Sequence, residues 1–299
     1  MEQVLEDIIK AGADIIFCVG PQMMPNSLKV AVEHPEVYIL NCSLNAPHPY
    51  IRTYYGRMYE AKFLAGMIAG AVTDNERVAY IADYPIYGMI ANINAFALGV
   101  ASVNPRAKVY LAWSKTKDYD RNKFLTENDL HYVSDQDIIT PNDASRYFGL
   151  YKLQDGQALN LAMPIWNWGV FYEKLLQSVL AGSYKAEGQE QVKALNYWWG
   201  MSAGVIDLIC SKHVPYGVKR LADHLKSDIT KGEVVPFFGQ IYDQKGELKN
   251  KGEHEMKPSD IMKMDWLVDN VVGSIPPMSE FVDNAKMVVE LKGVEENKL

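Results

Sequence analysis

The sequence predicts an α/β protein with two doubly wound lobes, each a mostly parallel sheet covered by helices. Three observations favour this fold class. Apolar, strand-like segments alternate with amphipathic helical segments along the chain. The stretch from Arg77 to Trp113 has the pattern of a complete strand–helix–strand unit, which implies parallel strands. The 299 residues are also enough for two domains of ordinary size.

The first hundred residues supply the elements of one lobe. We expect helices over residues 2–11, 25–33 and 57–72, and strands over 15–19 and 37–41. Gly66 and Gly70 lie four residues apart in the third of these helices. Small residues at that spacing allow close approach to a neighbour, and we expect this helix face to pack against the sheet.

The strand–helix–strand unit is the clearest part of the pattern. Val78–Ala82 is the first strand and ends at the turn Asp83-Tyr84-Pro85. A helix with apolar residues at helical spacing follows and stops before Pro105, because a residue preceding proline is pushed out of the α region. The second strand, Val109–Ala112, ends on Trp113. Ligands of such sheets bind outside the carboxyl ends of the strands.

The pattern after Trp113 is less regular. Residues 114–128 are polar and contain few apolar anchors, and a strand end with the acidic sequence Ser134-Asp135-Gln136-Asp137 follows. Further elements are expected as strands over 147–151 and 159–165 and helices over 170–180, 215–232 and 259–272.

The composition limits the class of partner. Hydrophobic residues make up 48% of the chain and charged residues 22%, which is ordinary for a globular protein. The net charge is −7 and no basic run occurs, so nucleic-acid binding is disfavoured. The three cysteines are odd in number and far apart, so we expect buried, reduced thiols. The six histidines show no metal-ligand spacing, so neither a metal nor a cofactor is expected.

The 22 residues YPIYGMIANINAFALGVASVNP (84–105) resemble the signature of the basic membrane protein (BMP) family. Further matches follow in the family's order at 164–172, 197–208, 236–247 and 264–276. Members of this family are substrate-binding proteins of ABC importers, and characterised members bind purine nucleosides or a purine base. The resemblance spans roughly the whole chain, including segments that resemble purine nucleoside receptor A.

The resemblance implies a periplasmic-binding-protein type I-like fold, with two lobes, three crossovers and a cleft between the lobes. It suggests lobes over 1–110 and 111–299, with segments of the second returning to the first. Crossovers are then expected at Trp113, in the run Ala162–Trp168 and after Trp199. Family members have an earlier strand and helix, so the first βα unit is missing here. We expect a fragment of a longer product; a partner or an altered fold covering the exposed strand is the alternative.

A purine nucleoside receptor must hold a flat base and a sugar, using aromatic faces for the base and carboxylates or amides for amines and hydroxyls. The candidates lie just past expected strand ends. They are Gln22, Asp83, Tyr84, Trp113, Asp135, Asp137, Trp168 and Trp199.

Each of the stronger candidates has a structural alternative. Asp83 is either a ligand contact or a carboxylate of the turn or helix cap. Trp113 either lines the cleft or packs at the hinge. As strand residues Trp166 and Trp168 would share a face, with one of them in the core, and Trp168 is the one expected in the cleft. Asp135 and Asp137 are either binding carboxylates or a solvated pair.

Two departures from the family pattern bear on the sugar. Ser202 and Ala203 replace the charged pair of a family turn. Tyr151 stands where a carboxylate is expected, unless the 131–137 segment takes that place. Both departures favour a nucleobase or another small planar ligand over a ribose-containing one.

These observations predict a non-catalytic solute receptor that partners the permease subunits of an ABC importer. The resemblance implies an extracytoplasmic, membrane-associated lipoprotein. No signal peptide opens this sequence, however, so a cytoplasmic ligand-sensing domain of a larger regulatory protein is the runner-up. A nucleoside hydrolase using the carboxylates near residue 135 is less favoured, because two spaced Asp are too few for that chemistry.

Overall fold

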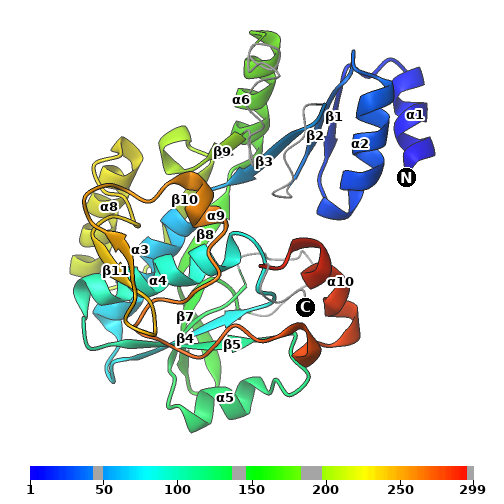
Figure 1. Ribbon diagram of the computed structural model, residues 1–299. Coiled ribbons are helices and arrows are strands. Elements are labelled where there is room, and N and C mark those ends of the chain that lie inside the picture. The colour runs from blue at the N-terminus through cyan, green and yellow to red at the C-terminus, as the bar shows by residue number, and fades with distance from the viewer. Residues whose placement is uncertain (43–49, 137–145, 183–196, 295–299) are drawn as a thin grey trace. The chain divides into compact units, whose positions relative to one another are not determined.

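The computed structural model describes residues 1–42, 50–136, 146–182 and 197–294 (Figure 1). The chain forms two compact units. Unit 1 comprises Met1–Gly56 and Trp168–Trp199, and unit 2 comprises Arg57–Asn167 and Gly200–Leu299. The chain therefore passes from one unit to the other three times, after Gly56, after Asn167 and after Trp199. Residue 110, where the sequence analysis places the lobe boundary, lies inside a strand of unit 2.

Unit 1 is a parallel sheet with helices. Its strands are β1 (Ile15–Cys18), β2 (Tyr38–Asn41), β3 (Arg52–Gly56) and β9 (Tyr197–Trp199), in that spatial order. Its helices are α1 (Glu2–Lys10), η1 (Pro21–Met23), α2 (Met24–Glu33) and α6 (Trp168–Leu180). The strand β3 was not expected from the sequence. All three cysteines are free thiols, but only Cys18 is fully buried as expected; Cys42 and Cys210 are half-buried.

Unit 2 contains a seven-stranded mixed sheet in the order β10-β8-β7-β6-β4-β5-β13. The strands are β4 (Arg77–Ala82), β5 (Lys108–Trp113), β6 (Tyr132–Ser134), β7 (Leu150–Gln154), β8 (Gln157–Trp166), β10 (Ile206–Cys210) and β13 (Val271–Val272). Four neighbours, β6, β4, β5 and β13, run parallel. The pairs β6–β7, β7–β8 and β8–β10 are antiparallel. The α/β fold class is confirmed, with an antiparallel extension that the sequence did not predict.

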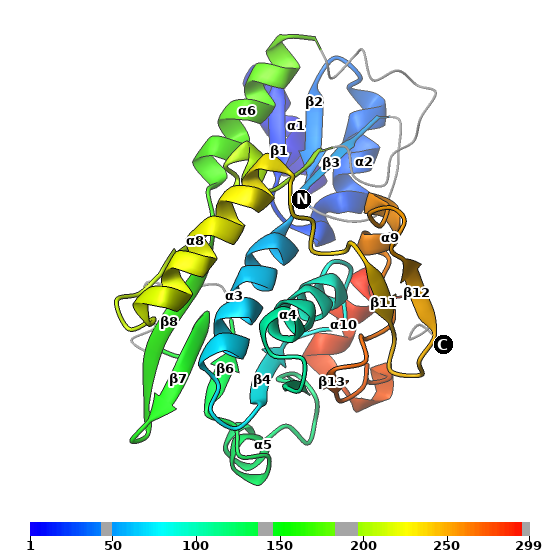
Figure 2. The ribbon, with the colours of Figure 1, turned by 90° about the vertical axis from the view of Figure 1, so that its left-hand side faces the viewer.

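The helices of unit 2 are α3 (Met58–Val72), α4 (Met89–Val103), α5 (Arg121–Glu127), α8 (Tyr216–Lys231), α9 (Pro258–Met262) and α10 (Asp283–Lys292). Figure 2 shows α3 between α4 and α8. The expectation that Gly66 and Gly70 pack against the sheet is wrong, because both face α4. A Cβ on Gly66 would overlap the carbonyl oxygen of Phe96, and a Cβ on Gly99 would overlap that of Phe63. No helix among the described residues is long and apolar enough to cross a membrane.

The expected helix over 259–272 is also wrong. Only the short helix α9 forms there, and β13 then pairs with β5. Asparagines explain the difference. Asn94 of α4 donates to the carbonyl of Trp266 (2.8 Å) and accepts from the N–H of Val268 (3.1 Å), while Asn270 donates to the carbonyl of Ala97 (2.8 Å). These contacts satisfy backbone groups that a helix would otherwise satisfy.

The segment from Pro277 to Val294 completes unit 2 and was not predicted. Phe281 is fully buried, and the backbone bridge between Thr116 and Phe281 joins this segment to the turn after β5. The N–H of Val294 donates to the carbonyl of Pro85 (3.2 Å), next to the turn after β4. The segment therefore packs against the ends of two central strands.

Candidate functional site

The carboxyl ends of the parallel strands β6, β4, β5 and β13 lie on one edge of the unit 2 sheet, which we call the carboxyl edge. Asp135, Asp83 and Ser114 directly follow β6, β4 and β5, and Ser274 comes two residues after β13. Ligands of α/β sheets bind at such edges. Four strands thus deliver polar groups to one place.

Asp83 is joined to the neighbouring turn. The hydroxyl of Ser114 donates to Asp83 Oδ1, and the N–H of Ser114 donates to the carbonyl of Ala82 (2.7 Å). Gly88, in the left-handed region at φ 81°, begins helix α4 without a side-chain cap, so Asp83 does not cap that helix. In the described chain no hydrogen bond reaches Asp83 Oδ2, which remains available as an acceptor. The adjacent Tyr84 is half-buried.

Trp113 lies at the same edge but is buried, with 5% of its surface exposed. Its indole N–H donates to the carbonyl of Ser274 (2.8 Å). The ring therefore joins the ends of β5 and β13, and it is a packing residue in this structure. Its role as a ligand contact stays a prediction.

Asp135 belongs to a hydrogen-bonded cluster that the sequence analysis missed in part. The hydroxyl of Tyr151 donates to Asp135 Oδ2 (2.9 Å), and Arg121 Nη2 donates to the Tyr151 oxygen (2.7 Å). Arg121 Nε lies 3.9 Å from Asp135 Oδ2. Tyr151 thus occupies a position beside a carboxylate instead of replacing one. Asp137 lies outside the described residues.

Electrostatics connect Asp83 to this cluster. Burial raises the pKa of the Tyr119 hydroxyl to about 12, and the charges of Asp135 and Asp83 add to the rise while that of Arg121 opposes it. Burial also raises the pKa of the Asp135 carboxyl, against the hydrogen bond from Tyr151 and the charge of Arg121. We call Arg121, Asp135 and Tyr151, which are joined by hydrogen bonds and an ion pair, together with Asp83 at the same carboxyl edge, the edge cluster.

A buried lysine adds a positive charge behind the edge cluster. Lys62 of α3 is 1% exposed, and its Nζ donates to the hydroxyl of Ser134, the last residue of β6 (3.3 Å). The ammonium group also lies 5.0 Å from the ring centroid of Tyr80. The charge of Lys62 lowers the pKa of Asp135 and so favours its ionised form. Burial of Lys62 was not expected from the sequence, because a lysine in a helix is usually solvated.

The candidate tryptophans of unit 1 belong to a set of contacting aromatic side chains, which we call the aromatic group. Its members, in contact through their rings, are Phe17, Tyr54, Trp168, Phe171, Tyr172, Tyr197 and Trp199. Trp168 stacks on Tyr172 with centroids 5.9 Å apart, and Trp199 lies 5.1 Å from Phe171. Trp168, Tyr172 and Trp199 are half-buried.

Trp168 and Gln22 of unit 1 lie in helical segments and not in strands. Trp166 and Trp168 do not share a strand face, because Trp166 ends β8 in unit 2 and Trp168 begins α6 in unit 1. Gln22 lies in η1 and is exposed, with its amide over Gly20. Asn41 at the end of β2 donates to the carbonyl of Gly20 (3.1 Å), which fixes the turn after β1.

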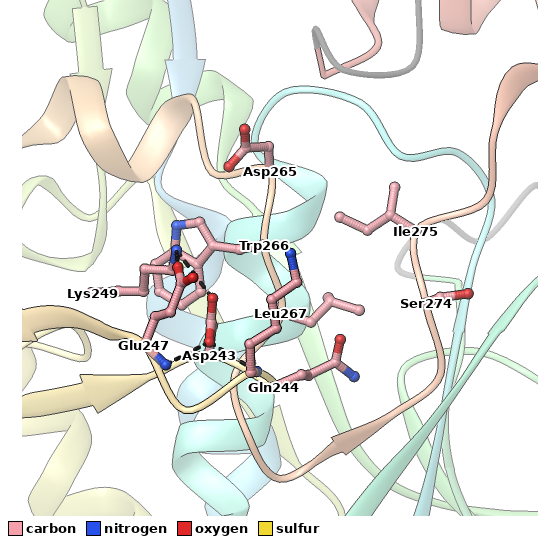
Figure 3. A pocket seen from close by; sticks show the side chains of 10 residues that line it. Asp243, Gln244, Glu247, Lys249, Asp265, Trp266, Leu267, Ser274 and Ile275 are labelled. Carbon is pink, nitrogen blue, oxygen red and sulfur yellow. Dashed lines mark hydrogen bonds and ion pairs between the residues drawn. The ribbon is translucent and has the colours of Figure 1, made fainter.

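Figure 3 shows a separate cavity of about 380 Å³ in unit 2, between the hairpin of β11 (Gln240–Tyr242) and β12 (Leu248–Lys251) and the segments at 265–267 and 274–275. Asp243 accepts the N–H groups of Lys245 and Glu247, both at 2.9 Å, and pairs with Lys249 at 3.0 Å. These contacts hold the hairpin turn. The cavity shares Ser274 with the carboxyl edge but contains none of the sequence-predicted residues.

Within the described ranges, no three His, Cys, Asp or Glu side chains gather in a way that could hold a metal ion.

The sequence of this chain is similar to a protein family and to two characterised or named relatives. A family model described as "ABC transporter substrate-binding protein PnrA-like" matches residues 1–147. A purine-binding protein of Brucella abortus (strain 2308) is 26% identical over 288 residues, covering 92% of this chain and 80% of the relative. A Haloferax volcanii protein, provisionally named an ABC transporter glucose-binding protein, is 30% identical over 217 residues. That match covers 68% of this chain and 54% of the relative.

Solved structures show the same fold. A transcriptional activator of the comK gene from Bacillus halodurans superposes with a TM-score of 0.61 at 15% identity, covering 79% of this chain and 86% of its own. An ABC transporter solute-binding protein from Conexibacter woesei gives a TM-score of 0.54 at 17% identity, covering 78% and 82%. At these identities the similarity establishes the fold alone.

Proposed function

Residues 1–147 of this chain belong to the PnrA-like family of ABC transporter substrate-binding proteins, and on that premise we propose that the protein binds a purine base or nucleoside. The relative from Brucella abortus, which is named a purine-binding protein, supports this choice of ligand. We further propose that the protein is non-catalytic, acts outside the cytoplasm near the membrane, and delivers its ligand to the permease subunits of an importer.

The observation that carries the proposal is the edge cluster. A purine presents N–H donors and ring-nitrogen acceptors around a flat ring. Asp83 Oδ2 is an acceptor, and Arg121, which contacts Tyr151 and Asp135, is a donor. Both lie at the carboxyl edge, the usual ligand-binding position in this class of sheet.

The aromatic group supplies the other requirement of a purine site, which is a ring face. Within unit 1, we propose Trp168 and Trp199 as the half-buried residues on which a base stacks. Stacking of a base on an aromatic side chain contributes about 1–3 kcal/mol. A sugar also stacks on tryptophan, and one relative is named for glucose, so glucose is the rival ligand.

A thermal-shift screen followed by isothermal titration calorimetry tests the proposal. The panel contains adenine, guanine, hypoxanthine, their nucleosides and glucose, since a ligand that binds the native state raises the melting temperature. We expect at least one purine to bind. Asp83→Asn and Trp168→Ala should each weaken binding, roughly 10-fold or more for the carboxylate. Asp223→Asn, on the exposed face of α8, is the matched control. If glucose binds and no purine does, the proposed ligand is wrong and the protein binds a sugar.

A further inference from the structure

Strand β1 is an open edge of the unit 1 sheet. Among the described residues it pairs only with β2, and it stands at the end of the spatial order of the sheet. The carbonyl of Asp14 accepts the N–H of Tyr38 (2.9 Å), and the carbonyl of Cys18 accepts the N–H of Cys42 (2.8 Å). The backbone groups of successive strand residues point alternately to the two sides of a strand. Residues 15, 17 and 19 therefore direct their N–H and C=O groups away from β2.

Nothing in this strand opposes pairing with a further strand. Natural proteins commonly protect an edge with a charged side chain, a proline or a bulge. Residues 15–19 read IIFCV, which contains no charge and no proline, and their register with β2 is continuous. Val19 is 68% exposed. The edge is therefore a template on which another strand can form.

Helix α1, which leads directly into β1, has an apolar face that the rest of its unit covers only in part. Its aliphatic residues Val4, Leu5, Ile8 and Ile9 recur at helical spacing, but only Leu5 is buried. Val4 is 54% exposed and Ile8 is 39% exposed. Figure 1 shows α1 as the outermost helix of unit 1, beside α2. Because such an apolar stripe normally faces a packed surface, α1 and β1 are two consecutive elements that each lack a neighbour.

From these features we infer that unit 1 binds unit 1 of a second copy of this chain, through antiparallel pairing of β1 with β1. Two copies of one strand related by a two-fold axis run antiparallel and form a closed pair. Centring the axis on Phe17 places Phe17 opposite its own counterpart and Ile15 opposite Val19. These are the residues whose backbone groups point away from β2, so each pair can exchange both N–H···O bonds.

The same register brings apolar side chains together and keeps like charges apart. Asp14, the nearest charged residue, lies opposite Gly20 and not opposite its own counterpart. Like charges directly opposite each other would destabilise the pair. Glu6 of α1 is already paired with His34 within one copy, with Oε1 3.0 Å from Nε2. The strand is thus complementary to itself, which favours a second copy over a partner of different chemistry.

Sedimentation velocity over a range of protein concentrations tests this pairing. We expect a monomer–dimer equilibrium for the wild-type protein. Val19→Lys places a charge at the end of the edge strand and should weaken dimerisation roughly 10-fold or more. Val4→Lys should weaken it as well, because it places a charge in the uncovered stripe of α1. Met287→Lys is the matched control, since Met287 is 73% exposed on α10 of unit 2, and it should leave the equilibrium unchanged.

Hydrogen exchange gives a second measurement that needs no variant. The amides of Ile15, Phe17 and Val19 should exchange more slowly at concentrations where the dimer forms than in dilute solution. The hairpin at 240–251 should exchange at the same rate in both.

A monomer at every concentration overturns the inference. So does a dimer that Val19→Lys leaves intact, or one without protection at residues 15–19. Concentration-independent protection of these amides in a monomer would assign the edge to another segment of the chain. The pairing does not depend on the ligand, so the dimer measurement and the purine screen can fail separately.

Discussion

At the scale of single residues, the structure places several charged side chains in buried positions and gives each a partner. Glu60 in the first turn of α3 accepts the N–H of Met201 (2.6 Å), and a Cβ on Gly200 would overlap its carboxylate, so a side chain there would displace Glu60. The charge of Arg57 also acts on Glu60. This contact joins α3 to the start of η2 (Met201–Ala203).

Glu60→Gln tests the cost of this buried charge. Burial raises the pKa of Glu60 above its ordinary value of 4.5, against the hydrogen bond from Met201. The native state then holds the proton more tightly than the unfolded chain, so the wild-type free energy of unfolding falls as the pH rises from about 4.5 through the native pKa. Glutamine keeps an acceptor but cannot ionise. The stability of the variant relative to wild type should therefore grow with pH, by about 1.4 kcal/mol per pKa unit.

Urea denaturation between pH 4 and pH 7.5 measures this difference. Glu233→Gln, at an exposed position, is the control and should change the stability by less than about 0.5 kcal/mol at each pH. A constant difference for Glu60→Gln across the range would show that the buried carboxylate carries no such penalty.

Tyr151→Phe tests the edge cluster without a ligand. The change removes the hydroxyl that accepts from Arg121 and donates to Asp135, leaving two charged groups with a lost partner. We expect a loss of about 1–3 kcal/mol in the free energy of unfolding. Tyr216→Phe, at a residue 75% exposed, should be nearly neutral. Equal stability of both variants would mean that solvent replaces the Tyr151 contacts.

At the scale of elements, the close approach of α3 and α4 depends on Gly66 and Gly99. Each faces a backbone carbonyl of the other helix, so a methyl group there cannot be accommodated by a side-chain rotation. We expect Gly66→Ala and Gly99→Ala each to lower the free energy of unfolding by about 1–3 kcal/mol, the usual cost of overpacking. Gly217→Ala in α8 meets no neighbouring atom and should be neutral or stabilising by up to about 1 kcal/mol.

The sequence predicted most of the elements between residues 2 and 113 because their periodicity is strong, and their ends agree with the structure within one or two residues. It failed where tertiary contacts decide. In the segment 259–272, where the sequence predicts a helix, hydrogen bonds made by Asn94 and Asn270 hold the chain against α4. The sequence also placed Asp83 correctly at a strand end. Arg121 could not be identified from residue spacing, because its partners lie far along the chain: Tyr151 is in β7 and Tyr147 comes just before that strand. The one local signal was Asp120, which caps α5.

At the scale of the whole molecule, the candidate residues are divided between two units: Asp83, Tyr84, Trp113 and Asp135 belong to unit 2, and Gln22, Trp168 and Trp199 belong to unit 1. Hydrogen exchange tests whether both serve one ligand. Saturating purine should slow amide exchange in peptides covering 83–86 and 119–123 in unit 2 and in peptides covering 168–172 in unit 1. The hairpin at 240–251 is an internal control and should not change. Protection confined to unit 2 would remove the aromatic group from the proposed site.

The last segment of unit 2 has a consequence for the order in which the chain matures. β13 pairs with β5, Phe281 bridges to the turn after β5, and Val294 bonds next to the turn after β4. During synthesis the ribosome therefore releases Asp83 and Ser114 long before the residues that seal their surroundings emerge. The carboxyl edge of unit 2 can therefore reach its final form only after the ribosome has released the residues up to Val294.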